Sequence, residues 1–144
     1  MSLVIKTSIP INATPEKVWS ILTDFKNYPQ WNPFITQIEG ELAINNKIKI
    51  KLEPPESNKM KFTPTIKTLT YNKEFSWLGH LFVPGLFDGN HSFFLQKSKG
   101  TTILLHEESF TGILVPLFKK QLLTNTKKGF ELMNKALKEL AETC

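Results

Sequence analysis

The C-terminal segment decides the fold, and residues 116–144 read PLFKKQLLTNTKKGFELMNKALKELAETC. After Pro116 no further proline interrupts it, and apolar side chains recur at steps of three or four. This spacing predicts one long amphipathic helix. Its apolar stripe consists of Leu122, Thr126, Phe130, Met133, Leu137 and Leu140. A helix of this length spans about 40 Å and must bury its stripe against another element.

The residues before this helix favour short β-strands. In KIKIKL, residues 47–52, the alternation turns Ile48, Ile50 and Leu52 inward and the lysines toward water. Two short helices follow the first strand, one starting at Thr14-Pro15-Glu16 and one within residues 24–33. The expected strands are residues 3–11, 47–52, 59–63, 75–80, 91–96 and 102–110.

This order of elements indicates the fold class. The inward face of the strands is the only apolar surface available to the terminal helix. We therefore predict an α+β fold in which a curved antiparallel sheet wraps around the C-terminal helix. One domain covers residues 1–144, a length that supports a sizeable core without disulfides or metal.

Composition narrows the classes of function. The net charge is +5, but all 18 basic residues are lysine, and the absence of arginine argues against nucleic-acid recognition. The single cysteine, Cys144, excludes a disulfide framework and a multi-cysteine zinc site. No long apolar run or basic-then-apolar leader is present, so we expect a cytoplasmic protein. The three histidines lack metal-binding spacing, phosphate-binding glycine loops are absent, and we expect no metal and no cofactor.

Several segments together resemble a known family in their order and spacing. They are TPEKVW (residues 14–19), TDF (23–25), YPQWNPFI (28–35), WLG (77–79), HSFFL (91–95) and HEESFTG (106–112). The chain resembles the START-like (SRPBCC) superfamily, in particular its polyketide cyclase/dehydrase-like members. The resemblance implies the helix-grip fold and, between sheet and helix, an internal cavity for a lipid, polyketide or sterol-like molecule. Such folds serve binding proteins as well as enzymes.

Strand alternation and the resemblance together select candidate ligand-binding residues. Inward-facing positions near the helix give Phe62, Trp77, His91, Phe93, His106, Glu108, Phe110, Phe130 and Met133, and the resemblance adds Trp31 and Asn32 near the cavity mouth. Among these, His106 and Glu108 project from one strand face and can share a hydrogen bond or a ligand group. We interpret His91, His106 and Glu108 as a polar anchor in an apolar cavity. The alternatives are a catalytic acid/base pair, a purely structural pair, and a strand parity shifted by one residue, which would turn all three side chains toward water.

We therefore predict that the protein binds a small hydrophobic molecule, and we assign no catalytic residues. One alternative is a cyclase or dehydratase that uses the His/Glu pair, and another is a lipid-transfer or protein-interaction module. Two apolar loops, residues 81–87 (LFVPGLF) and 113–118 (ILVPLF), are expected to pack together and close one end of the cavity. A weak contact of these loops with a membrane is the lesser interpretation.

Overall fold

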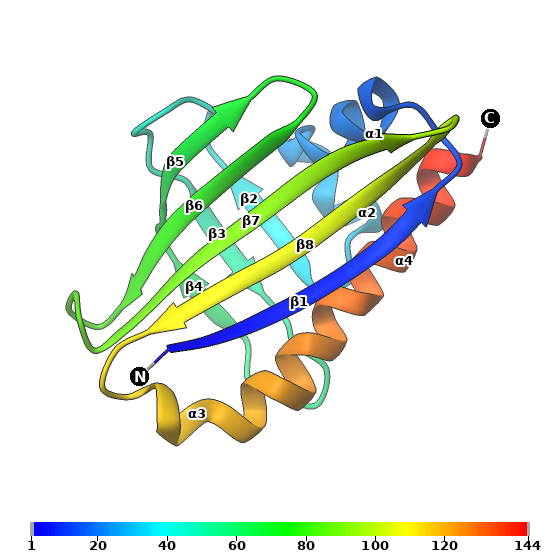
Figure 1. The fold of residues 1–144 in the computed structure, drawn as a ribbon. Coiled ribbons are helices and arrows are strands. Elements are labelled where there is room, and N and C mark those ends of the chain that lie inside the picture. The colour runs from blue at the N-terminus through cyan, green and yellow to red at the C-terminus, as the bar shows by residue number, and fades with distance from the viewer. Residues whose placement is uncertain (1, 144) are drawn as a thin grey trace.

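The computed structural model describes residues 2–143 and confirms the predicted α+β fold (Figure 1). Within these residues, eight antiparallel strands curve around a helix that ends at Glu142. In chain order the elements are β1 (Ser2–Ile11), α1 (Pro15–Leu22), η1 (Phe25–Asn27), α2 (Tyr28–Trp31), β2 (Ile35–Glu39), β3 (Lys49–Leu52), β4 (Met60–Phe62), β5 (Thr65–Thr70), β6 (Glu74–Leu81), β7 (Phe87–Ser98), β8 (Thr101–Thr111), α3 (Val115–Gln121), η2 (Leu122–Thr126) and α4 (Lys127–Glu142).

The strands form two hydrogen-bonded groups. The larger has the order β1-β8-β7-β6-β5 and the smaller the order β2-β3-β4. A bridge between Lys47 and Thr65 and hydrogen bonds such as Ile48 N to Pro64 O join them. Pro64 has no N–H to donate and lies where β4 ends and β5 begins, which explains why the ladder is interrupted there.

Strands β2 and β5 are absent from the sequence prediction. Each contains a register shift, between Ile35 and Gln37 in β2 and between Ile66 and Thr68 in β5. Such bulges break the period-two alternation by which strands are recognised in a sequence. The other expected strands are present with ends shifted by a few residues. The largest difference is in β7, which runs from Phe87 to Ser98 instead of the expected residues 91–96.

The C-terminal helix is one rod with an irregular turn. It begins at Val115, passes through the π-helical turn η2 and continues as α4, and α3 bends away from the line of α4 at this turn (Figure 1). The predicted stripe is buried from Leu122 to Leu137. The exception is Leu140, which is 40% exposed, whereas Ala141 is buried, because Ala141 follows Leu137 by a full helical step of four.

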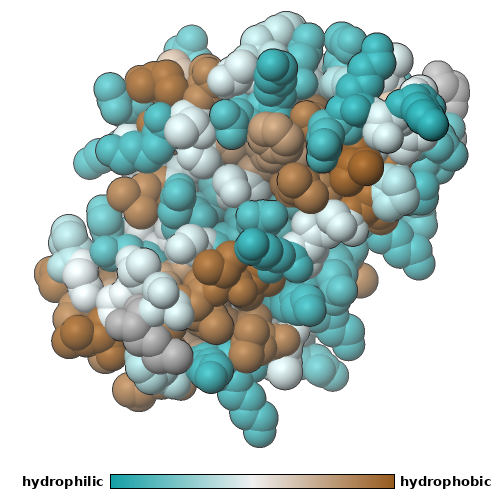
Figure 2. Space-filling model, in the orientation of Figure 1, coloured by the Kyte–Doolittle hydropathy of each residue, from teal (hydrophilic) through white to brown (hydrophobic). Residues whose placement is uncertain are grey.

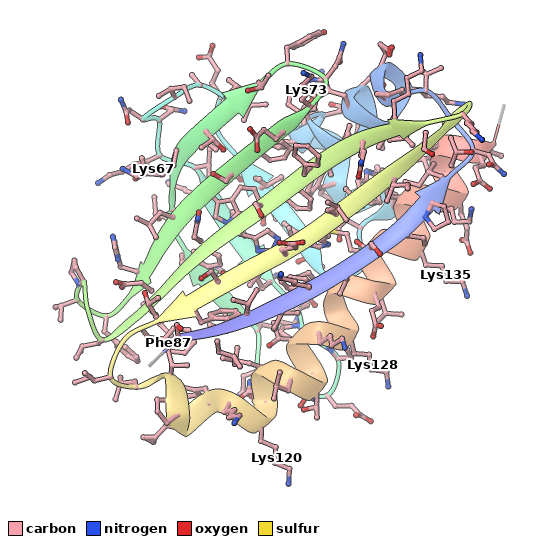
Figure 3. The ribbon with its side chains drawn as sticks, viewed as in Figure 1. Lys67, Lys73, Phe87, Lys120, Lys128 and Lys135 are labelled. Carbon is pink, nitrogen blue, oxygen red and sulfur yellow. The ribbon has the colours of Figure 1, made fainter. Side chains whose placement is uncertain are left out.

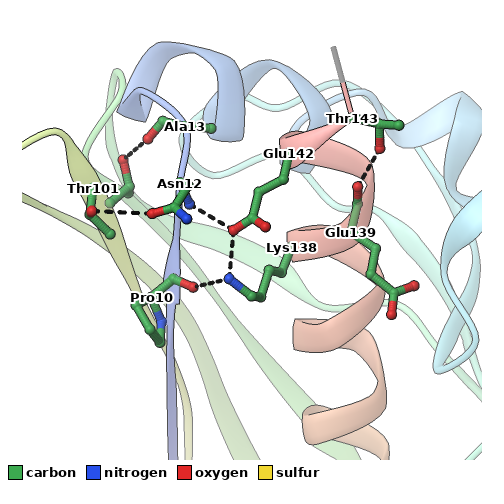
Figure 4. Close-up of polar contacts among 9 residues, drawn as sticks. Pro10, Asn12, Ala13, Thr101, Lys138, Glu139, Glu142 and Thr143 are labelled. Atoms are coloured by element: carbon green, nitrogen blue, oxygen red, sulfur yellow. Dashed lines mark hydrogen bonds and ion pairs between the residues drawn. The ribbon is translucent and has the colours of Figure 1, made fainter.

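Hydrogen bonds fasten the end of α4 to the end of β1 (Figure 4). The Glu142 carboxylate accepts a hydrogen bond from the backbone N–H of Asn12 at 2.8 Å and pairs with Lys138 at 2.5 Å. Lys138 also donates to the carbonyl oxygen of Pro10 at 3.0 Å. The helix is therefore held along β1, with its apolar stripe toward the inner face of the sheet.

Candidate functional site

The apolar cavity lies where β4, β6, β7 and β8 meet α3 and η2. Its volume is about 110 Å³, and most of its wall is apolar. The lining residues are Leu52, Pro54, Met60, Phe62, Gly79, His80, Leu81, Phe87, Gly89, Glu108, Phe110, Phe118, Gln121, Leu122 and Thr126. The volume is smaller than the roughly 300–1,000 Å³ that is usual for ligand pockets, because aromatic side chains such as Phe75, Phe93 and Phe130 fill the rest of the interior.

Two glycines on neighbouring strands make room for this cavity. Gly79 in β6 pairs directly with Gly89 in β7, and both line the cavity. A Cβ atom on Gly79 would lie 3.1 Å from the ring of Phe62, and one on Gly89 would lie 2.3 Å from Oε2 of Glu108. The hollow thus exists because the inward positions of two adjacent strands carry no side chain.

A buried row of polar side chains runs from the cavity to the helix. His91 in β7 lies opposite Glu108 in β8, and His91 Nδ1 is 3.0 Å from Glu108 Oε1. His91 Nε2 is 2.7 Å from Nε2 of His106. His106 Nδ1 is 2.8 Å from Oδ1 of Asn134 in α4. The row therefore connects the cavity wall with the C-terminal helix through the core.

The far end of this row determines its proton positions. The Thr7 hydroxyl donates its one proton to the backbone carbonyl of His106, so it accepts from Nδ2 of Asn134. The amide oxygen of Asn134 then faces His106 and accepts from Nδ1–H. Burial, with a smaller effect of the neighbouring His91, holds the pKa of His106 well below its ordinary value. The neutral ring accepts at Nε2, so His91 donates from Nε2 and turns Nδ1 to Glu108.

Aromatic rings enclose both imidazoles. Phe130 of α4 stacks on His106 with the ring centroids 4.2 Å apart, and Trp77 stacks on His91 at 4.9 Å. These contacts leave the two histidines 1% or less exposed. Of the polar row, only the Glu108 carboxyl reaches the cavity wall.

The two predicted apolar loops contact each other at one end of the cavity. Backbone N–H groups of Ile113 and Leu114 donate to the carbonyls of Gly85 and Leu86, and the rings of Phe87 and Phe118 pack edge to face. Figure 3 shows Phe87 at this end of the sheet, with Lys120 pointing away from α3. The expectation that the loops pack together is thus confirmed. Four of their large apolar side chains nevertheless stay exposed, namely Phe82, Val83, Ile113 and Leu117.

A hydrogen-bonded pair of side chains, His80 and Asp88, borders the same end. His80 lines the cavity, and its Nδ1 is 2.7 Å from Oδ1 of Asp88. The Asp88 carboxylate also accepts from the backbone N–H of Gly85. The hydrogen bond from His80, more than that from Gly85, lowers the pKa of Asp88. This pair holds the β6–β7 loop in place.

The structure distributes the predicted site residues between cavity and core. Phe62, Glu108 and Phe110 line the cavity, and the inward orientation expected for His91 and His106 agrees with their burial. The remaining candidates do not line the cavity: Trp77, Phe93, Phe130 and Met133 are core residues, and Trp31 packs against Tyr28.

Asn32 serves a turn at the end of α2. Its side-chain oxygen accepts hydrogen bonds from the backbone N–H groups of Phe34 and Ile35, both at 2.9 Å. Asn32 is itself extended, as expected for a residue that precedes proline. The side chain thereby directs the chain from α2 into β2, away from the cavity.

The sequence prediction did not include several residues that build the site. Gly79 and Gly89 lie at inward positions of their strands, and this parity is the signal that could have revealed them. Asn134 and Thr7 gave no such signal, because their role depends on how the helix is placed against β1.

A second hollow of about 370 Å³ lies over the three-stranded group. Its wall includes Lys49, Lys51 and Lys61, which point outward as the alternation predicts. These lysines are surface residues with no buried polar partner to orient a ligand, so we take the smaller, apolar cavity as the candidate site.

Comparisons with known proteins agree with this architecture. Over nearly its whole length, the chain has the START-like helix-grip fold. The superposition on a START superfamily protein from Mycobacterium smegmatis covers 96% of this chain and 97% of that protein, with 21% sequence identity and a TM-score of 0.72. The superposition on the Zhui aromatase/cyclase from Streptomyces sp. R1128 covers 99% of this chain and 94% of that protein, with 13% sequence identity and a TM-score of 0.79. The superposition on Ara h 8.0201 covers 95% of this chain and 98% of that protein, with 12% sequence identity and a TM-score of 0.66.

The amino-acid sequence also matches a known protein family over part of the chain. The model of the family described as "Polyketide cyclase / dehydrase and lipid transport" matches residues 2–63. The resemblance deduced from the sequence motifs is thereby confirmed. No curated protein was found to match the sequence. Within residues 2–143, none of the helices is both long enough and apolar enough to cross a membrane.

Proposed function

We propose that this protein binds a small hydrophobic molecule in the cavity between β4, β6–β8 and the α3–η2 segment. The observation that carries this proposal is the facing pair Gly79 and Gly89, which opens an apolar space beside the carboxyl of Glu108. An apolar cavity of about 150 Å³ accommodates benzene. The cavity here is smaller, at about 110 Å³, so it limits the buried part of the ligand to at most one ring or a short branched chain, with any larger part extending toward His80.

Methyl NMR on the intact protein tests this function. Met60 lines the cavity and Met133 is buried in the core away from it, so their methyl signals report on ligand entry and on global change, respectively. Titration with p-cresol is expected to shift the Met60 signal saturably and to leave the Met133 signal nearly unchanged. Equal shifts of both signals, or none at saturating p-cresol, would contradict the proposal.

A matched pair of variants ties that signal to the cavity. Leu122→Trp fills the space, because Leu122 lines it. Leu123→Trp adds the same ring at a neighbouring position that is 42% exposed. We expect Leu122→Trp to abolish the Met60 shift and Leu123→Trp to preserve it, with circular dichroism confirming that both variants are folded.

A second candidate function is collection of the ligand from a membrane surface. The specific observation is the exposed apolar group Phe82, Val83, Ile113 and Leu117 at the end of the cavity, next to Lys119 and Lys120. Figure 2 shows apolar side chains gathered at the lower left, where Figure 1 places the β6–β7 loop and the start of α3. Apolar side chains bordered by lysines suit an anionic bilayer.

A further inference from the structure

The polar groups of the cavity wall restrict the chemistry of its ligand. Glu108 contributes a carboxyl group, and the other polar side chains in the wall belong to His80, Gln121 and Thr126. None of the 18 lysines lines the cavity, although the chain carries a net charge of +5. His80, the other titratable group of the wall, is already paired with Asp88. A bound anion would therefore lack a free cationic partner.

The hydrogen bonds of Glu108 determine what its free oxygen can do. Oε1 lies 3.0 Å from Nδ1 of His91, and a hydrogen bond between these two atoms requires one proton, carried by either of them. Whichever atom holds that proton, Oε2 carries only lone pairs and is an acceptor. Oε2 lies over Gly89, where a Cβ would approach it to 2.3 Å, and within residues 2–143 it makes no hydrogen bond to another protein group.

We propose that the cavity selects ligands that donate a hydrogen bond, such as a phenol, an alcohol or an amine, and rejects carboxylates. The donor bonds to Oε2 of Glu108 while the apolar part fills the space made by Gly79 and Gly89. A carboxylate would place a second acceptor against Oε2 in an apolar environment, which is unfavourable. This inference rests on the proposed function, because it names the class of ligand for the same cavity.

The polar row maintains this selectivity by fixing the orientation of the Glu108 carboxyl group. His91 cannot turn its Nδ1 away from Glu108, because its Nε2–H is bonded to His106, and His106 is bonded to Asn134. Reversing the direction of the row would leave the carbonyl of His106 or the hydroxyl of Thr7 without its partner. Glu108 thus keeps Oε1 on the histidine and Oε2 toward the ligand.

Four ring-sized probes of closely similar shape test the inference: p-cresol, p-toluidine, p-xylene and p-toluate. Binding is followed by the methyl signal of Met60 in the intact protein. Because p-xylene is more hydrophobic than p-cresol, the decisive quantity is the change that a Glu108 variant causes for each probe. Glu108→Met removes the acceptor. It should weaken the binding of p-cresol and p-toluidine by about tenfold and change the affinity for p-xylene less than threefold.

Two further variants sharpen this result. Glu108→Gln can donate from Nε2 to His91 and keep Oε1 toward the ligand, so it should bind p-cresol within about threefold of the parent protein. Glu107→Met makes the same change as Glu108→Met on the opposite face of β8, and it should leave all four affinities unchanged. If Glu108→Met fails to fold, the comparison of p-cresol with p-toluate on the unchanged protein decides, since p-toluate should not bind where p-cresol saturates.

Each remaining outcome has a definite meaning. Equal loss of p-cresol and p-xylene in Glu108→Met, or binding of p-toluate as tight as that of p-cresol, would overturn the donor selectivity and leave the binding function standing. Failure of all four probes to move the Met60 signal would overturn the binding function and the selectivity with it.

Discussion

At the scale of single residues, the site depends on the strand register as much as on residue type. The sequence placed His106 and Glu108 on one face, two residues apart, where they could share a hydrogen bond or a ligand group. In the structure His91 stands between them, because β7 pairs with β8 so that His91 faces Glu108. Period-two alternation predicts the face of a side chain, but not its partner on the next strand.

Burial of a neutral His106 predicts a pH-dependent stability. The folded protein holds the pKa of His106 well below 6.5, mainly by burial, whereas the unfolded chain titrates near 6.5. Below that pH the unfolded state binds a proton that the folded state does not. The free energy of unfolding therefore falls with decreasing pH, by up to about 1.4 kcal/mol per pH unit, until the folded pKa is reached. Above about pH 7.5 this effect is absent.

Urea unfolding at pH 7.5 and pH 5.5 measures this loss, which we expect to be about 1.4 kcal/mol from this one group. His106→Gln keeps one donor and one acceptor but takes up no proton, so its stability should change less between the two pH values. His80→Asn, at the exposed histidine, serves as the control. The lowered pKa values of Glu53, Asp88 and Glu142 affect stability only below about pH 4.5, outside this window. An unchanged slope in His106→Gln would refute the assignment.

At the scale of elements, regular periodicity was predictable and irregular backbone was not. The stripe from Leu122 to Leu137 and the alternation in β3 follow from the sequence, since each repeats the period of its element. The bulges in β2 and β5 and the π-helical turn at Leu122–Thr126 have no such pattern. The turn nevertheless matters for the site, because Leu122 and Thr126 at its two ends line the cavity.

The packing of α4 predicts an effect contrary to helix propensity. Replacing Gly129 by alanine in an ordinary helix would stabilise it by about 1 kcal/mol. Here the new Cβ would lie 2.4 Å from Cδ1 of Phe34, a fully buried ring that packs against Phe130. Overpacking of this kind costs about 1–3 kcal/mol. We therefore expect Gly129→Ala to lower the free energy of unfolding by up to about 2 kcal/mol in urea titrations.

Adding Phe34→Leu to Gly129→Ala should recover part of that loss, because the smaller side chain makes room for the new methyl group. A Gly129→Ala protein more stable than the parent would show that Phe34 moves aside at no cost, and that the close approach of α4 at this point does not constrain the packing.

At the scale of the whole molecule, the order of elements was enough to predict the fold but not the size of the cavity. A curved sheet around a helix follows from one terminal amphipathic helix after a series of strands. Whether the space between them is filled depends on which inward positions hold aromatic rings and which hold glycine. Here Trp77 and Phe93 fill the centre, and the hollow is confined to the end marked by Gly79 and Gly89.

This confinement brings the cavity next to the exposed apolar loops, and it predicts how the molecule meets a bilayer. Vesicles with an anionic lipid should carry part of the protein upward in a flotation gradient. Binding should weaken with added salt, because Lys119 and Lys120 act from the surface. The double variant Phe82→Ser with Leu117→Ser should lose most of the vesicle binding. The control Tyr71→Ser removes a 77% exposed ring from the β5–β6 turn and should bind vesicles like the parent protein. Equal binding by all three proteins would show that the apolar loops do not contact the membrane, because bulk charge alone would then account for the attraction.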